Sequence, residues 1–340
     1  MTRRHDASGM DGVLVIAKPA GPTSHDVVAL ARRLTGTRRI GHGGTLDPFA
    51  SGVLPLFLGG ATRLVEYHLA DRKAYRATIC FGAASTTDDL DGELTPVDGP
   101  VLSSAVVEAA LEGFRGEIRQ RPPAFSAIQV AGRRAYAMAR EGAAPELPER
   151  VVTIHRLELV AWNSDDPSRP IAVVDVECSA GTYVRAIARD LGAALKSAAY
   201  LGALTRTASG PFRLDDAVTL DALRAAATEG GDAVAALLLP VDAGLEAMPS
   251  IRLEPAEIAD AAMGRFVRPA AGVGKVPAEA PIRLLDTAGR LVGIGTVEGR
   301  RISPSKMLPA AVAAIAPKVA QQAAAGSTFD PASDPVTSDA

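Results

Sequence analysis

The stretch GHGGTLDPFASGVLPLFLGGATRL, residues 41–64, is the most distinctive part of this chain. It concentrates turn-forming residues within twelve positions, at Gly41, Gly43, Gly44, Pro48 and Gly52. Glycine reaches backbone conformations that are closed to other residues, and it lets a second group approach the backbone closely. We therefore expect a constrained glycine-rich loop over residues 40–58 that lies against another part of the molecule.

Taken alone, this loop does not identify a chemistry. An isolated Asp47-Pro48 pair is more typical of a turn than of a nucleophile, and an isolated His42 is more typical of a turn or a cap. The loop lacks the lysine of a phosphate-binding P-loop and the glycine spacing of a dinucleotide-binding turn. It therefore predicts no nucleotide cofactor.

The surrounding segments predict a mixture of strands and helices. Apolar runs bounded by turn residues predict strands over 12–17, 73–82, 151–160, 171–178, 282–286, 291–297 and 302–308. Helical spacing of apolar residues predicts helices over 23–34, 133–141 and 182–195. The last three strands form a small β-rich second domain, and the Ala-, Gly-, Ser- and Pro-rich segment 310–340 is expected to be a disordered tail.

Composition limits the class of protein. The 340 residues are 47% hydrophobic and 22% charged, which is ordinary for a globular protein of two domains. Cys80 and Cys178 are far apart and without metal-ligand spacing, so we expect neither a disulfide scaffold nor a metal site, and a reducing compartment. Apolar runs are too short to span a bilayer, and the charged N-terminus does not resemble a signal peptide. We therefore expect a cytoplasmic protein without membrane contact.

Charge is distributed unevenly along the chain, although the formal total is only −3. Residues 82–112 contain seven acidic and no basic side chains, and we expect a solvated acidic loop there rather than a calcium site. Residues 115–140 carry six arginines against Glu117. A segment of this kind can clamp a nucleic-acid backbone, with Arg133 and Arg134 as candidate phosphate contacts.

Four segments together change the interpretation of the loop. They are KPAGPTSHDVV (18–28), GHGGTLDPFASGVLPL (41–56), RPPAFSAIQVAGRRAYAMAR (121–140) and SAGTYVRAIARDLG (179–192). Their order resembles that in the bacterial tRNA pseudouridine synthase B family, and the resemblance extends over residues 10–240. It implies an intramolecular transferase that isomerises uridine to pseudouridine at position 55 in the T-loop of tRNA. It further implies base flipping, an aspartate nucleophile and no cofactor.

The resemblance also implies a fold and a set of partners. The catalytic domain, residues 10–240, should be an α/β (α+β) domain built on a central mixed, largely antiparallel sheet, with an RNA-clamping basic segment at 115–145. Residues 250–309 resemble a small PUA-like RNA-binding β domain. The T-stem-loop of tRNA is the implied partner, and we expect a monomer with no obligatory protein partner.

Site residues follow from the resemblance position by position. Asp47 matches the nucleophile, Arg185 the arginine paired with it, and Tyr75 the tyrosine that lies against the uracil and is proposed as a general base. In the substrate pocket, His42 matches the residue that occupies the space of the flipped nucleotide. Tyr183 matches a pocket tyrosine, and Leu204 matches an apolar wall.

Physical chemistry adds three expectations. The reaction breaks a glycosidic bond and rejoins the uracil through carbon, so one ionised carboxylate in a dry pocket suits it. A guanidinium at Arg185 near Asp47 should favour the charged carboxylate and lower its pKa. Tyr183 and Arg185 can both reach Asp47 only if the chain there is extended or just entering a helix. We expect Lys18 to be a structural support near the site.

The sequence departs from the family pattern at several positions, and rival functions stay open. Gly43, Phe125, Gln129 and Thr205 replace residues that are usual in the family, and Gln129 removes one cation. The alternatives are a catalytically silent tRNA-binding or folding protein on the same scaffold, and a hydrolase that uses Asp47. The hydrolase would need a second carboxylate or metal ligands that no motif supplies.

Overall fold

The computed structural model describes residues 10–314, apart from 127, 131, 144, 271, 275, 277, 278 and the side chain of Arg134. The chain divides into two compact units, with the boundary between Leu239 and Pro240. The helix α9 (Pro309–Ala313) covers the first residues of the segment expected to be a disordered tail, and the rest of that segment lies outside the described residues.

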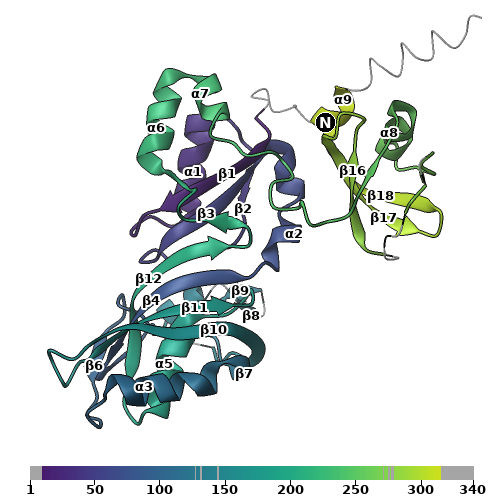
Figure 1. Cartoon of the computed structure of the whole chain (residues 1–340). Helices are drawn as coiled ribbons and strands as arrows, with labels where there is room; N and C mark the ends of the chain where they lie inside the picture. The colour runs from purple at the N-terminus through teal and green to yellow at the C-terminus, as the bar shows by residue number, and fades with distance from the viewer. Residues whose placement is uncertain are drawn as a thin grey trace, which may run out of the picture. The chain divides into compact units, whose positions relative to one another are not determined.

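A large mixed sheet organises the first unit (Figure 1). Its strands are β1 (Gly12–Lys18), β2 (Ile40–His42), β3 (Ser51–Leu58), β4 (Lys73–Phe81), β7 (Gly116–Gln120), β10 (Arg150–Asn163), β11 (Ile171–Cys178), β12 (Ala199–Ser209), β13 (Phe212–Arg213) and β14 (Val218–Thr219). The main order is β14-β1-β3-β12-β4-β11-β10-β7, with β2 beside β3 and β13 beside β12. Only the β1–β14 and β3–β12 pairs are parallel, which confirms the expected mixed, largely antiparallel sheet.

Helices and short hairpins complete this unit. The helices are α1 (Ser24–Thr35), α2 (Glu66–Leu69), α3 (Ser104–Leu111), α4 (Ala135–Arg140), α5 (Val184–Ala194), α6 (Leu220–Glu229) and α7 (Gly231–Ala235), with 3₁₀ turns at Gly59–Arg63 and Glu112–Phe114. The hairpins pair β5 (Ala83–Ser85) with β6 (Leu94–Pro96), and β8 (Gln129–Val130) with β9 (Arg133–Arg134). Arg133 and Arg134 therefore precede the helix that was expected to include them.

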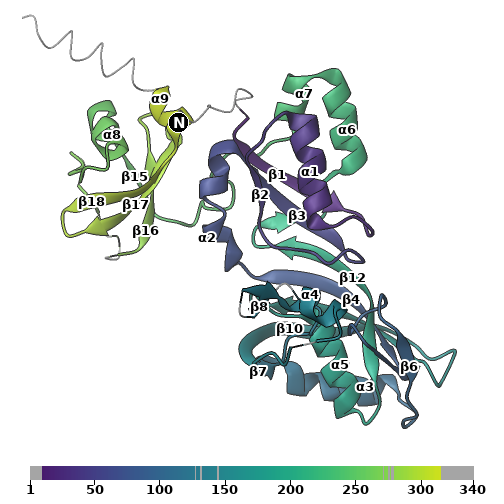
Figure 2. The same cartoon turned by 180° about the vertical axis from the view of Figure 1, so that it is seen from behind.

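Two hydrophobic cores share the sheet. One joins α1, α6 and α7 to β1 and β3, and the other joins α3 and α5 to β4, β10, β11 and β12. Figures 1 and 2 show these two groups of helices beside different halves of the sheet. The parallel contact of β3 with β12, at Ser51–Thr205 and Gly52–Arg206, is where the halves meet.

The glycine-rich segment is shorter than expected. We expected a loop over residues 40–58, but β2 takes its first residues and β3 its last eight, so the loop is confined to residues 43–50. The reason is burial. The sequence SGVLPLFL forms β3, which pairs with β1 on one edge and with β2 and β12 on the other, and all its residues except the first are buried. Proline lacks the N–H that a strand residue donates to its neighbour. The Pro55 carbonyl accepts from the Gly43 N–H, and Gly43 lies just beyond the end of β2, so the Pro55 nitrogen on the same edge does not interrupt the β2–β3 ladder.

The second unit is a small sheet with its own core. It contains β15 (Ser250–Arg252), β16 (Pro281–Leu285), β17 (Leu291–Glu298), β18 (Arg301–Met307) and the helices α8 (Pro255–Ala262) and α9. The strands follow the order β15-β16-β17-β18 around a separate apolar cluster. Among the helices of the described ranges, none has the length and apolar character needed to cross a membrane.

Candidate active site

The loop that carries Asp47 is fixed from below by the segment that follows β1. The Lys18 ammonium donates to the carbonyls of Pro19, Pro22 and Pro48, and the Gly21 N–H also donates to the Pro48 carbonyl. The Ser24 hydroxyl donates to the Leu46 carbonyl at 3.0 Å and accepts from the Leu46 N–H at 2.9 Å. Lys18 therefore supports the loop through its backbone, as expected.

Apolar anchors on either side of Asp47 complete this support. Leu46 and Ala50 are buried in the core formed by β4, β11 and β12, whereas the Asp47 side chain stays 35% exposed. The backbone is thus anchored on both sides of Asp47, while the carboxylate is largely buried but still accessible. That combination suits a group that must meet a substrate.

Arg185 brings two carboxylates together. Its guanidinium, 5% exposed, lies 3.0 Å from an Asp47 oxygen and 3.1 Å from an Asp89 oxygen. It also donates to the carbonyls of Thr87 and Phe125, at 3.0 Å each. One buried cation therefore joins the Asp47 loop, the acidic segment and the start of the basic segment.

The chain enters a helix between Tyr183 and Arg185. Tyr183 is extended, with φ −101° and ψ 110°, and α5 begins at the next residue. The Gln120 side chain bonds to both the N–H and the carbonyl of Tyr183. This geometry agrees with the expected entry into a helix, although the Tyr183 ring lies under the Arg150 guanidinium, 4.6 Å from it.

The pKa of Asp47 moves in the direction opposite to our expectation. Burial of the carboxylate raises its pKa more than Arg185 lowers it, and the nearby Asp89 charge raises it further. We expected a lower pKa from the Arg185 charge alone, but Arg185 is shared between Asp47 and Asp89. Asp47 is therefore an ionisable group with a pKa above the ordinary aspartate value of 3.8.

The expected solvated acidic loop is wrong for Asp89 and Asp88. Asp89 is 4% exposed and accepts hydrogen bonds from the Thr87 hydroxyl and the Asp91 N–H. Asp88 pairs with Arg189 at 2.8 Å. Arg185 and Arg189 are one helical turn apart on α5 and form ion pairs with Asp89 and Asp88 respectively. That arginine spacing was the signal in the sequence that could have placed Asp88 and Asp89 next to α5.

Tyr75 lies opposite an arginine that the sequence analysis missed. In the antiparallel β4–β12 pair, Tyr75 is the direct partner of Arg206. Arg206 is 1% exposed and donates to the carbonyls of Val53 at 2.7 Å, Gly44 at 3.1 Å and Thr45 at 3.4 Å. Burial raises the pKa of Tyr75, and the Arg206 charge partly offsets the effect. The alternating pattern around Arg206 gave no signal for its burial, since a lone arginine in a strand is usually solvated.

His42 and Leu204 also lie near the loop. His42 ends β2, and its Nδ1 accepts the Gly44 N–H at 3.3 Å, so the neutral ring carries its proton on Nε2. Burial, His25 and Arg206 all lower the pKa of His42, which favours this neutral form. Leu204 is 8% exposed, packs in the core that includes Leu46, and pairs with Ala77 across β4.

The basic segment contacts these groups through Gln120 and Phe125, whereas Arg133 and Arg134 belong to its β8–β9 hairpin. The Arg133 side chain is exposed and pairs with Glu141 at 2.5 Å, and the Arg134 side chain is not described. The structure thus brings Asp47 to Arg185, Tyr75 to Arg206, and His42 to the loop. It places Tyr183 against Arg150.

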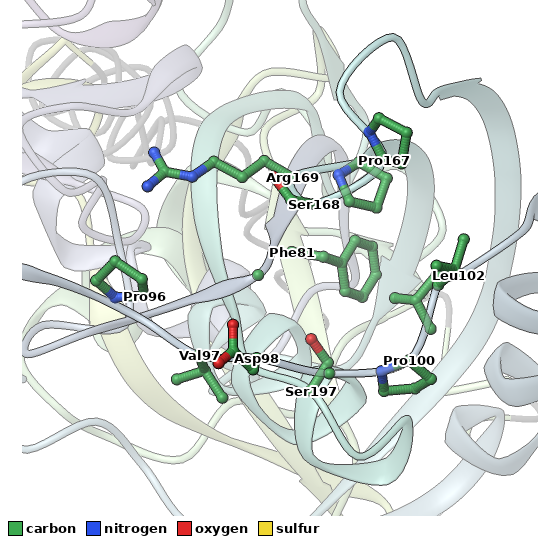
Figure 3. A pocket seen from close by; sticks show the side chains of 14 residues that line it. Phe81, Pro96, Val97, Asp98, Pro100, Leu102, Pro167, Ser168, Arg169 and Ser197 are labelled. Atoms are coloured by element: carbon green, nitrogen blue, oxygen red, sulfur yellow. The ribbon is translucent and has the colours of Figure 1, made fainter.

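A cavity of about 450 Å³ lies elsewhere in the first unit (Figure 3). Phe81, Pro96, Pro100 and Pro167 surround it, together with neighbouring loop residues. Phe81 ends β4, and Tyr75 lies six positions earlier in the same strand, about 20 Å from the cavity that Phe81 lines. This cavity is not part of the candidate active site.

Comparison with known proteins agrees with this geometry. The family described as "TruB family pseudouridylate synthase (N terminal domain)" matches residues 32–184, and "tRNA pseudouridylate synthase B C-terminal domain" matches residues 185–246. The tRNA pseudouridine synthase B of Synechococcus sp. (strain WH7803) is 44% identical over 85% of this chain and 94% of its own length. The protein of the same name from Symbiobacterium thermophilum is 48% identical over 72% of this chain and 79% of its own.

Solved structures resemble the chain in fold. A Cbf5-Nop10-Gar1 complex has a TM-score of 0.66 at 24% identity, covering 87% of this chain and 84% of that one. A second, an H/ACA RNP bound to a substrate RNA containing 2'-deoxyuridine, has a TM-score of 0.65 at 23% identity, with the same coverage. At these identities the likeness concerns the fold alone. Because the family models and the curated relatives span most of the chain, the chain belongs to the TruB family of pseudouridylate synthases.

Proposed function

We propose that this chain isomerises the uridine at position 55 in the T-loop of tRNA, with Asp47 as the nucleophile. Family membership makes it an enzyme that converts uridine to pseudouridine in tRNA. The observation that carries the assignment of Asp47 is the 3.0 Å ion pair between its partly exposed carboxylate and buried Arg185. The cytoplasm is the proposed compartment.

The shared arginine suits a nucleophile. Arg185 carries one positive charge between Asp47 and Asp89, so the three groups keep a net negative charge when both acids are ionised. Arg185 orients the Asp47 carboxylate, and Asp89 prevents complete neutralisation. Asp47 can therefore attack the nucleoside while the surrounding apolar residues exclude water.

The bond changes need no redox partner. The Asp47 oxygen forms a bond to the nucleoside, at C1′ of the sugar or at C6 of the uracil, and that bond breaks again before the product leaves. Between these events the N1–C1′ bond of uridine breaks, the uracil turns, and a C5–C1′ bond forms. The C5 proton then leaves, and N1 gains a proton, so atoms and electrons balance within the substrate. We propose that Tyr75 mediates this proton transfer: its oxygen accepts the C5 proton while its own hydroxyl proton passes to solvent, from which N1 is protonated. Tyr75 is suited to this role because it packs against the apolar cluster that contains Leu46 and Ala50, on either side of Asp47.

Base flipping requires surfaces that replace the lost stacking. Unstacking one base costs a few kcal/mol, and stacking on an aromatic ring returns about 1–3 kcal/mol. We propose that neutral His42 takes the place of the flipped nucleotide in the T-loop and that Leu204 and Tyr183 border the uracil pocket. A neutral imidazole stacks without the desolvation penalty of a charged one.

The remaining contacts concern the backbone of the tRNA. We propose that residues 115–145 clamp the T-stem, with Arg133 and Arg134 at phosphates, and that the PUA-like unit, residues 250–309, adds a second RNA contact. A single chain would then act without a protein partner. Replacing Arg133 and Arg134 by serine should weaken tRNA binding and flatten its salt dependence, by about two charges in the slope.

One assay tests the central proposal. Purified wild-type protein and Asp47→Asn are incubated with an unmodified tRNA transcript, and pseudouridine is mapped at single-nucleotide resolution. We expect wild-type product at position 55 only, no product with Asp47→Asn, and equal tRNA binding by both. Activity in Asp47→Asn contradicts the nucleophile, product elsewhere contradicts the position, and binding without any wild-type product supports the catalytically silent alternative.

A further inference from the structure

Arg206 is a buried cation with an unusual set of partners. It is the largest of the fully buried side chains in the described part of the chain. Its guanidinium donates to three backbone carbonyls, whereas Arg185 pairs with two carboxylates. Burying a positive charge against neutral partners is unfavourable unless its hydrogen bonds are well satisfied. Such a group in the middle of the sheet calls for an explanation.

Its first set of partners fixes the Asp47 loop. Gly44 and Thr45, whose carbonyls accept from Arg206, precede the nucleophile by three and two residues. Val53, the third partner, lies on the other side of the loop in β3. The planar guanidinium fork thus ties both ends of the loop to β12. A shift of the fork would move the Asp47 backbone.

Its second partner is Tyr75. Arg206 and Tyr75 are directly opposite in the β4–β12 pair, so their side chains stand on the same face with Cβ atoms about 5 Å apart. The two groups are close enough for the Arg206 charge to influence the ionisation of the phenol, and for the phenol to influence that of Arg206. The cross-strand pair thus places the Tyr75 ring beside the same guanidinium that holds the Asp47 loop.

We propose that Arg206 is a positioning residue for the isomerisation, which holds the Asp47 loop by its carbonyls and sets the Tyr75 hydroxyl at a fixed distance from it. One rigid group then determines the separation between the nucleophile and the ring that faces the uracil. The inference rests on the proposed function, because it assigns Asp47 and Tyr75 their roles. It adds a residue that acts on the reaction through the Asp47 loop and through Tyr75.

Gly52 supports this role independently. It is paired with Arg206 in the short parallel contact of β3 with β12, at φ 112°. A Cβ at this position would collide with backbone atoms of Arg206. The close approach of the two strands lets the arginine side chain reach beneath the loop.

The test compares Arg206→Lys, Arg206→Gln and the control Arg115→Lys. Lysine keeps the charge and glutamine keeps a planar amide, but neither reproduces the planar fork that binds three carbonyls at once. Arg115 donates to the Leu157 carbonyl at 3.0 Å in the same unit, so its variant matches the loss of an arginine–carbonyl bond. We expect kcat to fall by about 100-fold in both Arg206 variants, as for a small misplacement of reacting groups, with tRNA affinity unchanged.

Two readouts separate positioning from general destabilisation. In protein labelled with ¹³C at tyrosine Cζ, the Tyr75 resonance, identified by its loss in Tyr75→Phe, should shift in the Arg206 variants and stay in place in Arg115→Lys. The fold-decrease in kcat caused by Arg206→Lys should also be smaller in the Tyr75→Phe background than in the wild type. The resonance readout needs no activity, and Arg206→Gln serves if Arg206→Lys does not fold.

The outcomes are distinct. An unchanged Tyr75 resonance, full kcat in a folded Arg206 variant, or an equal factor in both backgrounds overturns the inference. Failure of the proposed function gives a different result, namely activity in Asp47→Asn. If Asp47→Asn is inactive and Arg206→Lys is fully active, only the role of Arg206 is lost.

Discussion

Two buried arginines contact the Asp47 loop, and they differ in the groups that they bind. Arg185, at the first turn of α5, meets the carboxylates of Asp47 and Asp89. Arg206, in β12, donates to backbone carbonyls and is the cross-strand partner of Tyr75. Burial lowers the pKa of Arg206, while Asp47, beside Arg185, has a raised pKa.

The difference separates control of charge from control of position. A guanidinium shared by two acids changes the electrostatic free energy of the nucleophile. A guanidinium that binds carbonyls has no carboxylate partner, and its fork fixes the backbone that carries the nucleophile. Substitutions at Arg185 should therefore act on turnover and its pH dependence, and changes around Arg206 should act on geometry and stability.

The largest expected effect is that of Arg185→Lys on turnover. A lysine cannot reach both carboxylates and two carbonyls, so the Asp47 carboxylate loses its orientation. We expect kcat to fall by about 10²–10³-fold, as when one preorganised electrostatic contact is removed. The measurement is single-turnover pseudouridine formation with enzyme in excess of tRNA.

The matched control is Arg189→Lys, one turn further along α5. Arg189 pairs with Asp88 and Asp190 rather than with Asp47. We expect a much smaller loss there. Equal losses in the two variants would mean that α5 packing, and not the charge at Asp47, carries the effect.

The next effect concerns the contact beneath Arg206, tested by Gly52→Ala. The added methyl would collide with the Arg206 backbone at a φ of 112° that alanine rarely adopts. We expect a loss of several kcal/mol in the free energy of unfolding, or failure to fold, measured by urea unfolding.

Gly116→Ala separates backbone strain from collision. Gly116 has φ 81°, and a Cβ there meets nothing within 4 Å. Strain alone should cost about 1–2 kcal/mol. If Gly52→Ala is no worse than Gly116→Ala, the close approach of β3 to β12 is unimportant.

A smaller effect is expected on the pH dependence in Asp89→Asn. Asp47 must be ionised to attack, so kcat/KM is lost as the pH falls through its pKa, which lies above 3.8. Asp89 raises that pKa. Removing its charge should move the acid limb of the kcat/KM profile to lower pH. The measurement is kcat/KM as a function of pH, with a tRNA transcript as the substrate.

Asp91→Asn is the control for this shift. Asp91 is exposed and two residues away, and only its backbone N–H contacts Asp89. Its acid limb should coincide with that of the wild type. A limb that stays in place in Asp89→Asn would show that Asp89 does not influence the ionisation of Asp47.

The smallest expected effect is a gain in stability in Asp47→Asn. An acid whose pKa is raised in the folded state binds protons more tightly there than when unfolded, so its ionisation destabilises the fold. The destabilisation is present above the raised pKa and vanishes as the pH falls to the ordinary value of 3.8. Asp47→Asn should therefore raise Tm by a few degrees at neutral pH.

Calorimetry across pH checks this sign. The gain in Tm of Asp47→Asn over the wild type should shrink as the pH is lowered. A variant less stable than the wild type at neutral pH would mean that Arg185 stabilises the Asp47 carboxylate more than burial disfavours it.

Local patterns in the sequence were enough for most elements of the fold. The helix after β1 begins where Thr23 and Asp26 form a capping box and ends at left-handed Gly36, both of which are encoded within a few residues. The strand Ile171–Cys178 was predicted with its observed bounds, because its composition and flanking turns are local. The family match rested on four short segments that keep their order.

Tertiary structure decided which charged groups are buried. The sequence predicted a solvated loop around Asp89 and a loop at the end of the glycine-rich segment, and it gave no prediction for Arg206. All three are buried, because a local sequence pattern does not determine which distant segment will cover it. Strand β3 became a buried strand when β1, β2 and β12 flanked it. The raised pKa of Asp47 depends on burial and on a second acid 42 residues away. The sequence determines which side chains are present, but the desolvation of Asp47 and its sharing of Arg185 with Asp89 arise only when distant segments pack together.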